Sequence, residues 1–153
     1  LIGIACYIFN LTLMKGEYIM GYTNYYHQEI DFTDEEWNQI KSEFIYIIGH
    51  AGSEIDVQYN TDDRIQFNGK PGYSCESFYI DKKARTEEDR RYPDQDISLH
   101  FCKTRELPYD IYVWHMLVFI KGMKGIKSND FSIDRDPYTE PYEEDMKGSY
   151  EGK

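Results

Sequence analysis

The stretch FTDEEWNQIKSEFIYII, residues 32–48, is the most informative for the fold of this chain. Thr33 and Glu36 have the spacing of a helix capping box, in which each side chain accepts a hydrogen bond from the other residue's backbone N–H. Phe32 before the cap and Trp37 after it match the hydrophobic staple that accompanies such a box. Apolar residues then recur on one helical face, at Trp37, Ile40, Phe44, Ile47 and Ile48. The stretch therefore predicts an amphipathic helix that ends at the glycines that follow, Gly49 and Gly52.

Short β-prone segments lie on both sides of this helix. Residues 21–27 are rich in tyrosine and predict a first strand. Residues 55–60 alternate apolar and polar side chains, which predicts a half-buried strand. Further strands are expected at residues 65–67, 76–81, 97–102 and, as an edge strand, 131–133. The turn residues Asn68-Gly69 and Pro71-Gly72 separate two of these strands.

A second helix is predicted after Pro108, where residues 111–120 are apolar nearly all round. Ten residues are too few to cross a bilayer, so we expect this helix to be buried across the sheet. Residues 82–95 are almost wholly polar and predict an exposed, solvated loop. Together these elements predict an α+β fold: a single small domain with a mostly antiparallel or mixed sheet and two helices packed on it.

The two ends of the chain differ from its middle. Residues 1–14 are apolar, but they are too short for a membrane span and lack the basic start of a signal peptide. Lys15-Gly16-Glu17 can be encoded by a ribosome-binding sequence at the usual distance before Met20. We therefore expect residues 1–19 to be translated leader DNA, with a real N-terminal strand or hydrophobic arm as the alternative. The domain is then expected at residues 20–136, followed by an acidic flexible tail at 137–153.

Composition restricts the possible partners. The formal net charge is −11, which disfavours direct binding to nucleic acid or to anionic membranes. The three cysteines, Cys6, Cys75 and Cys102, are odd in number and show no CxxC spacing. A disulfide framework or a structural zinc site is therefore not expected, and a reducing, cytoplasmic compartment fits best. No cofactor is expected.

Several polar residues are expected at strand ends, where a rigid scaffold presents functional groups. Lys103-Thr104 before the second helix can hold an anion. Asn24 and Asn68 can recognise the polar edge of a ring that stacks on Tyr22. The candidate ligand-binding residues are Tyr22, Thr23, Asn24, Asn68, Glu76, Lys103, Thr104, Tyr109 and Asp110. They predict a small, polar, nucleotide-like ligand, against the alternative that they only form turns and helix caps.

The sequence gives weaker support to several other functions. Cys102 or Cys75 paired with a histidine is a candidate nucleophile, although a buried, inert cysteine is the more usual case. The four histidines show no metal-binding spacing, so no metal site is predicted. Glu76 and Asp110 are candidates for a carboxylate-based hydrolase. The excess of acids also suits a protein-interaction module that inhibits a host factor.

Three blocks of sequence, taken together, resemble one family. They are Met20-Gly21-Tyr22-Thr23 with Phe32-Thr33-x-x-Glu36-Trp37, Phe67-Asn68-Gly69 with Glu76-x-Phe78, and Phe101-Cys102-Lys103-Thr104 with Pro108-Tyr109-Asp110. The family consists of small phage and bacterial proteins of unknown function that open with a Met-Gly-Tyr-Thr-His-Tyr-Trp-like string; here Asn24 and Tyr26 replace its histidine and tryptophan. The resemblance covers roughly residues 20–121. It implies a phage or prophage accessory protein in the host-cell cytoplasm, and it supports Met20 as the start.

Overall fold

The computed structural model describes residues 22–136, so the predicted leader, the start at Met20 and the predicted tail lie outside the described residues. Six strands and two α-helices follow one another along this part of the chain. In order they are β1 (Thr23–Gln28), α1 (Asp34–Ala51), β2 (Ile55–Asn60), β3 (Arg64–Gly69), β4 (Phe78–Asp81), β5 (Leu99–Lys103), α2 (Asp110–Gly122) and β6 (Phe131–Arg135). Short 3₁₀ turns lie at Gly52–Glu54 and Glu87–Asp89.

The strands form two three-stranded antiparallel sheets, in the orders β5-β1-β6 and β2-β3-β4. In the first sheet, Tyr26 at the centre of β1 is paired with His100 on β5 and with Ile133 on β6. The sheets approach each other where the backbone N–H of Glu76 donates to the carbonyl of Lys103 at 3.1 Å. The predicted α+β class and the edge strand near residue 131 are confirmed, with two antiparallel sheets in place of a single one.

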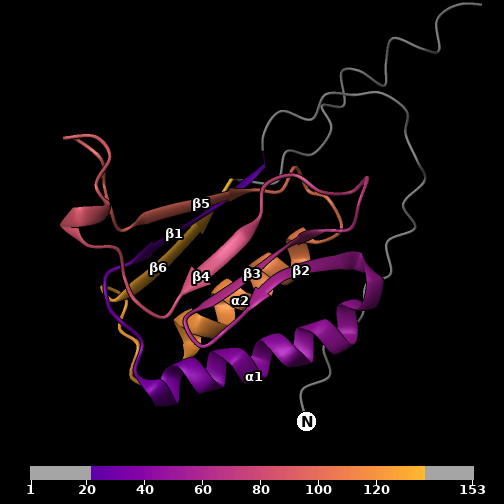
Figure 1. Cartoon of the computed structure of the whole chain (residues 1–153), viewed down its shortest axis with the longest axis horizontal. Helices are drawn as coiled ribbons and strands as arrows, with labels where there is room; N and C mark the ends of the chain where they lie inside the picture. The colour runs from indigo at the N-terminus through magenta and orange to yellow at the C-terminus, as the bar shows by residue number, and fades with distance from the viewer. Residues whose placement is uncertain (1–21, 137–153) are drawn as a thin grey trace, which may run out of the picture.

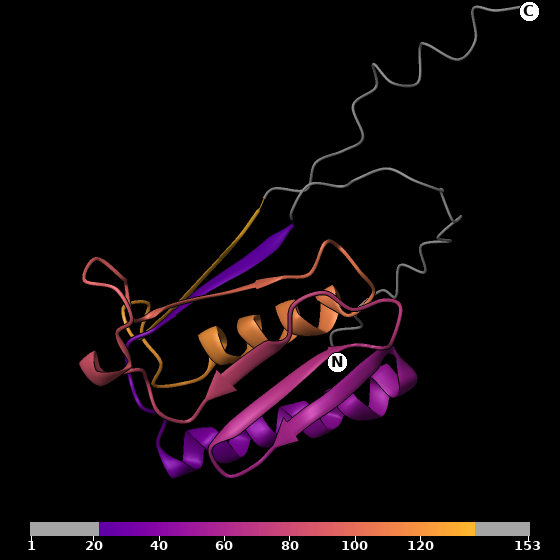
Figure 2. The same ribbon diagram turned by 45° about the horizontal axis from the view of Figure 1, so that its top comes forward.

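Both helices pack on the same side of the strands, so the domain has a strand layer and a helix layer. In Figure 2 strands β2, β3 and β4 pass in front of the helices, and strands β5, β1 and β6 lie above α2. The ring of Phe44 on α1 stacks on that of Phe67 on β3, with 5.5 Å between centroids, while α2 contacts β1 and β6. The two helices also contact each other, and one core runs beneath both sheets (Figure 1). Within residues 22–136, neither α-helix covers the opposite face of the β2-β3-β4 sheet.

The start of α1 is as predicted. Thr33 accepts a hydrogen bond from the backbone N–H of Glu36 at 3.2 Å, and the Glu36 carboxylate accepts one from the N–H of Thr33 at 2.8 Å. Phe32 and Trp37 stack with their ring centroids 6.3 Å apart. Three acidic residues in the first turn complement the helix dipole. The helix continues through Gly49 and ends at Gly52, whose φ of 52° suits glycine.

Strand β2 differs from its prediction. Only Ile55 is buried, whereas Val57 and Tyr59 are exposed. The pairing register between β2 and β3 shifts between these two residues, so that Tyr59 lies opposite Gln66 on the face away from the helices. A bulge of this kind moves a side chain from one face of a sheet to the other.

Helix α2 is not fully buried, so that prediction was wrong. It buries Val113, Met116, Leu117 and Ile120. Ile111 is 67% exposed, and Val118 is also exposed, because α1 and the β5-β1-β6 sheet together cover only part of the helix surface. Among the described residues, the helices are too short or too polar to cross a membrane.

Candidate functional site

Three of the predicted site residues meet around the carboxylate of Asp110. The side-chain amide of Asn24 donates to Asp110 Oδ1 at 2.7 Å, and the hydroxyl of Thr104 donates to the same oxygen at 2.5 Å. Arg135 Nη2 lies 3.7 Å from Asp110 Oδ2. We call these four residues the Asp110 network. Thr104 is fully buried and its hydroxyl is committed to Asp110, so it is not available to an anion beside Lys103.

Tyr22 and Thr23 join the edge of this network. The guanidinium of Arg135 lies over the ring of Tyr22 at 4.8 Å and over that of Trp114 at 4.5 Å. Burial lowers the pKa of Arg135. Thr23 donates its backbone N–H to the carboxylate of Asp136 at 2.9 Å. The network therefore connects β1, β6 and the start of α2, and its polar atoms are used largely by one another.

A second group forms around Glu76, beside the end of β5. The hydroxyl of Tyr109 donates to the Glu76 carbonyl at 2.8 Å, and the Glu76 carboxylate accepts the backbone N–H of Lys103 at 2.8 Å. Burial raises the pKa of the Tyr109 phenol, which keeps it protonated and able to donate. Asn68 accepts from the N–H of Cys75 at 3.2 Å and donates to its carbonyl at 3.0 Å. Through these two hydrogen bonds, Asn68 fixes the conformation of the loop that joins β3 to β4.

The nine predicted residues thus form two neighbouring groups in which many polar atoms bind one another. The buried Tyr22 hydroxyl and Asn24 Oδ1 are exceptions, because neither has a hydrogen-bond partner within the described residues. The two candidate hydrolase carboxylates, Glu76 and Asp110, have different partners. Cys102 is fully buried, and burial raises the pKa of its thiol far above the usual range. His100 contacts Tyr79 instead of a cysteine. Within residues 22–136, no cluster of His, Cys, Asp and Glu has the arrangement of a metal site.

A groove lies elsewhere, on the face of the β2-β3-β4 sheet that carries no helix. Its volume is about 1400 Å³. The sheet forms its floor, and the loop after β4 together with Phe101 on β5 forms its wall. We call it the sheet-face groove; its principal residues are Tyr59, Arg64, Gln66, Ser77, Tyr79, Asp81, Lys83, Arg85, Asp89, Arg91, Tyr92, Gln95 and Phe101. The loop predicted as a solvated connection is therefore part of a candidate site.

Tyr79 on β4 occupies the middle of this groove. The guanidinium groups of Arg64 and Arg85 lie 4.9 and 5.9 Å from the centre of its ring. Arg85 also donates to the Tyr79 hydroxyl, which in turn lies 3.1 Å from Nδ1 of the buried His100. Burial, assisted by the charge of Arg85, lowers the pKa of His100 to about 4. The imidazole is therefore neutral at physiological pH, and its Nδ1 shares a hydrogen bond with the Tyr79 hydroxyl.

The cations of the groove differ in their pairing. Arg64 forms a two-pronged ion pair with Asp81, at 2.6 and 2.7 Å, and this bond raises its pKa. Lys83, Arg85 and Arg91 have no salt bridge to any carboxylate of the described region. Lys103 and Lys121 also have no salt bridge to a described carboxylate, but Lys83, Arg85 and Arg91 lie together in one groove. The groove can therefore hold an anion and can stack planar rings on its aromatic side chains.

The sequence interpretation missed these residues, although one signal was present. Five of the basic residues fall within residues 82–91, namely Lys82, Lys83, Arg85, Arg90 and Arg91. The same stretch holds three acids, Glu87, Glu88 and Asp89, so the signal is an excess of two positive charges in an acidic chain. The exposed aromatic residues gave no comparable signal, because the alternating pattern of β2 placed Tyr59 on the buried face.

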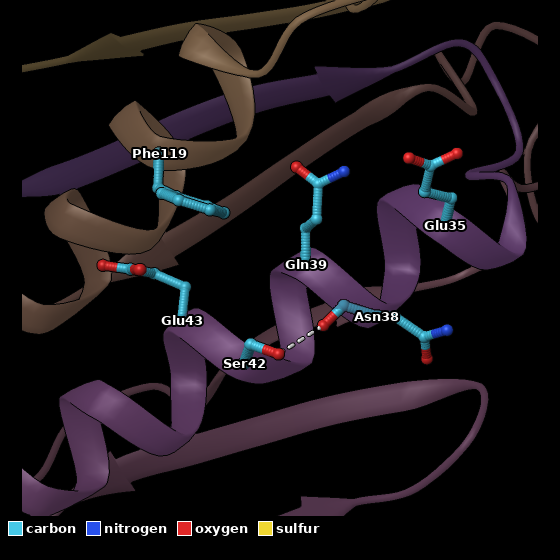
Figure 3. Close-up of a pocket in the computed structure, with 6 residues that line it drawn as sticks. All are labelled: Glu35, Asn38, Gln39, Ser42, Glu43 and Phe119. Atoms are coloured by element: carbon cyan, nitrogen blue, oxygen red, sulfur yellow. Dashed lines mark hydrogen bonds between the residues drawn. The ribbon is translucent and has the colours of Figure 1, made fainter.

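A second hollow lies between the two helices and has a volume of about 670 Å³. Figure 3 shows the polar side chains of α1 along one side and Phe119 of α2 on the other. Its residues are Glu35, Asn38, Gln39, Ser42, Glu43 and Phe119. Nε2 of His115 on α2 lies 2.6 Å from the carboxylate of Glu43, so this imidazole has a hydrogen-bond partner on α1.

Comparisons of the chain with protein-family models, with curated proteins and with solved structures gave no match, so the functional argument depends on the geometry described above.

Proposed function

We propose that this protein binds a nucleotide-like ligand, a planar ring system that carries phosphate, in the sheet-face groove. The observation that supports this most is the gathering of Lys83, Arg85 and Arg91, unpaired within the described region, beside exposed aromatic rings in an acidic protein. The predicted class of ligand is kept, but its site moves from the Asp110 network to the groove. A phage or prophage accessory role and a cytoplasmic location stay predictions, based on the resemblance and the cysteine usage.

Each part of such a ligand has a counterpart in the groove. The ring of Phe101, 57% exposed on β5, offers a surface on which a base can stack. Lys83 and Arg91 can neutralise a phosphate, and arginine can hold two of its oxygens at once. Gln66 donates to Gln58, and Gln95 accepts from the backbone N–H of Arg91, which leaves the side-chain oxygen of Gln66 and the NH2 group of Gln95 for the edge of a base. Tyr79 is already fixed by Arg85 and His100, so the floor of the site is preorganised.

A thermal-shift screen of AMP, ATP, GTP and cyclic nucleotides tests this proposal. We expect at least one of them to raise the Tm by several degrees at millimolar concentration, because ligand binding to the folded state stabilises it. The double variant Lys83→Gln/Arg91→Gln should lose this shift. The matched control Lys121→Gln, which removes an exposed lysine on α2, should retain it. A folded protein that no nucleotide stabilises would contradict the proposal.

A second candidate function, binding of a partner protein, is favoured by the outward face of α2. Ile111, Trp114 and Val118 follow one another at helical spacing, and two of them are exposed. A helix that is apolar all round is normally covered on every side. The hollow that Glu35 and Glu43 line on α1 is bordered on α2 by Phe119, the residue next to Val118 in the chain (Figure 3). The combination suits a partner's amphipathic helix with an apolar face and a basic edge.

Two synthetic helical peptides that share a leucine face but differ in their charged edge test the second function. The peptide with a lysine edge should bind, and the peptide with a glutamate edge should not. Val118→Lys should abolish binding, whereas Lys127→Glu, outside this face, should leave it unchanged. Equal binding of both peptides, or none by either, would count against a partner of this kind.

A further inference from the structure

The sheet-face groove is larger than one nucleotide requires. Its volume of about 1400 Å³ exceeds the roughly 300–1,000 Å³ of a typical small-molecule pocket. It is also elongated across the fold, since its lining comes from β2, β3 and β4, from the loop after β4 and from β5. A mononucleotide would leave much of this lining uncovered.

The aromatic residues of the groove are too far apart to contact the same base. Tyr59 lies on β2, at one edge of its sheet, and Phe101 lies on β5, in the other sheet. Strands are spaced about 4.8 Å apart, so β2 and β4 are separated by about 10 Å, and β5 lies beyond β4. Tyr59 is 51% exposed and Phe101 is 57% exposed, so each ring offers a face to the ligand. Two separate bases are needed to occupy both.

The bulge in β2 strengthens this point. Without the register shift between Val57 and Tyr59, the regular alternation of the strand would place Tyr59 on the helix side of the sheet. The shift places it opposite Gln66, on the floor of the groove. The ring is thus directed toward the groove at the end farthest from Phe101.

The charges of the groove suit a chain with several phosphates. Three carboxylates also line the groove: Asp81 is paired with Arg64, and Asp63 and Asp89 accept hydrogen bonds from Thr61 and Thr86. Lys83, Arg85 and Arg91, which have no salt bridge within the described region, outnumber the two unpaired carboxylates. Beyond the groove the surface is acidic, with exposed carboxylates at Asp62, Glu87, Glu88 and Asp94. A longer strand would therefore gain repulsion and no further contacts. The net charge of −11 disfavours binding of nucleic acid to the protein surface as a whole. Within the groove, the local electrostatic potential depends on the cations that line it.

From this arrangement we infer that the sheet-face groove takes a short single-stranded oligonucleotide, with one base on Tyr59, another on Phe101 and the linking phosphates on Lys83, Arg85 and Arg91. The inference rests on the proposed function and names its ligand class. Stacking on aromatic rings tolerates any base, so recognition is expected to be largely independent of sequence. A duplex is excluded, because its bases are not available for stacking.

Fluorescence anisotropy with the full chain and labelled thymidine probes of one, two, four and eight nucleotides tests this inference. We expect affinity to rise at least tenfold from the mononucleotide to the tetranucleotide and then to level off at eight. The slope of log affinity against log salt should be about −2 for three cations on a single strand. A tetrauridine probe separates RNA from DNA, and an eight-base-pair duplex should not bind.

Variants of Tyr59 and Phe101 test whether each of these two rings contributes to binding. Tyr59→Ala should weaken the tetranucleotide at least fivefold and leave the mononucleotide unchanged. The matched control is Tyr46→Ala, which removes a similarly exposed tyrosine from α1, outside the groove. Phe101→Ala should weaken both probes, and circular dichroism should show that each variant is folded.

The outcomes separate the two proposals. Equal affinity for one and four nucleotides, or an unchanged tetranucleotide affinity in Tyr59→Ala, overturns the oligonucleotide inference but leaves nucleotide binding intact. If no probe binds to the folded protein, both proposals fail.

Discussion

The amide of Asn24 on β1 donates a 2.7 Å hydrogen bond to the carboxylate of Asp110 at the start of α2, although 86 residues separate them in the chain. Asn24 is fully buried and Asp110 nearly so. A buried carboxylate with good partners stabilises a particular arrangement of the chain, and the loss of those partners is costly. The Asp110 network therefore stabilises the arrangement in which β1 lies beside β6 and the start of α2.

Replacing Asp110 by Ala should lower the free energy of unfolding by about 2–4 kcal/mol, because it leaves the buried groups of Asn24 and Thr104 without an acceptor. Asp110→Asn should cost less, since its amide oxygen can still accept from both. Urea denaturation followed by circular dichroism measures the change. The control Asp134→Asn, at an exposed position of β6, should stay within about 0.5 kcal/mol of wild type. A similar small effect for Asp110→Ala would contradict a structural role for the network.

Two glycines should respond in opposite ways to substitution by alanine. A Cβ on Gly69 would lie 2.0 Å from the carbonyl oxygen of Tyr73 and 2.7 Å from the ring of Tyr109, so Gly69→Ala should destabilise the protein by about 3 kcal/mol. A Cβ on Gly49, inside α1, would meet nothing within 4 Å. Gly49→Ala should therefore stabilise the helix by roughly 0.5–1 kcal/mol. Thermal unfolding distinguishes the two, and equal effects would refute the packing argument.

The stability of the protein should fall in mild acid because of His100. Its pKa is about 4 in the folded protein, against 6.5 for a free histidine. As the pH falls from 6.5 to 4, the unfolded chain binds a proton that folded His100 does not, so the free energy of unfolding decreases, by up to roughly 3 kcal/mol. His100→Phe, which keeps the stacking on Tyr26, should flatten this part of the pH profile. An unaltered profile in His100→Phe would rule His100 out as the cause.

The described cysteines should differ in reactivity. Cys102 is fully buried, its thiol lies 3.4 Å from the Glu76 carbonyl, and burial raises its pKa far above the usual range. Cys75 is only half-buried. Under native conditions a maleimide should therefore modify Cys75 before Cys102, and Cys102 should react only after denaturation. Peptide mapping by mass spectrometry measures this order. Rapid native labelling of Cys102 would show that the region opens readily.

Local features of this fold were predictable from the sequence, and long-range ones were not. The capping box of Thr33 and Glu36 depends on four neighbouring residues, so the sequence predicts α1 closely. The burial of α2 was overestimated, because a helix that is apolar on all sides does not indicate which side other elements cover. The position of Tyr59 was missed, because a bulge changes the face of a strand without changing its pattern.

The same distinction applies to the candidate site. Asn24, Thr104 and Asp110 were selected as ligand-binding residues, which stays a prediction, and the fold shows that they bind one another. Arg135 was missed because its partners lie far away along the chain. The groove combines five segments, and no single one of them carries the pattern of a binding site. Their combination depends on how the two sheets are joined.

The order of the strands also has a consequence for biosynthesis. Of the described strands, β1 leaves the ribosome first, but its neighbours β5 and β6 are made last. Strands β2, β3 and β4 pair only with near neighbours in the chain and can assemble while translation continues. During that time β1 has both edges unpaired, which is a hazard for aggregation. This strand therefore needs protection from aggregation during translation. A chain released before residue 131 would lack β6 and would leave one edge of β1 unpaired.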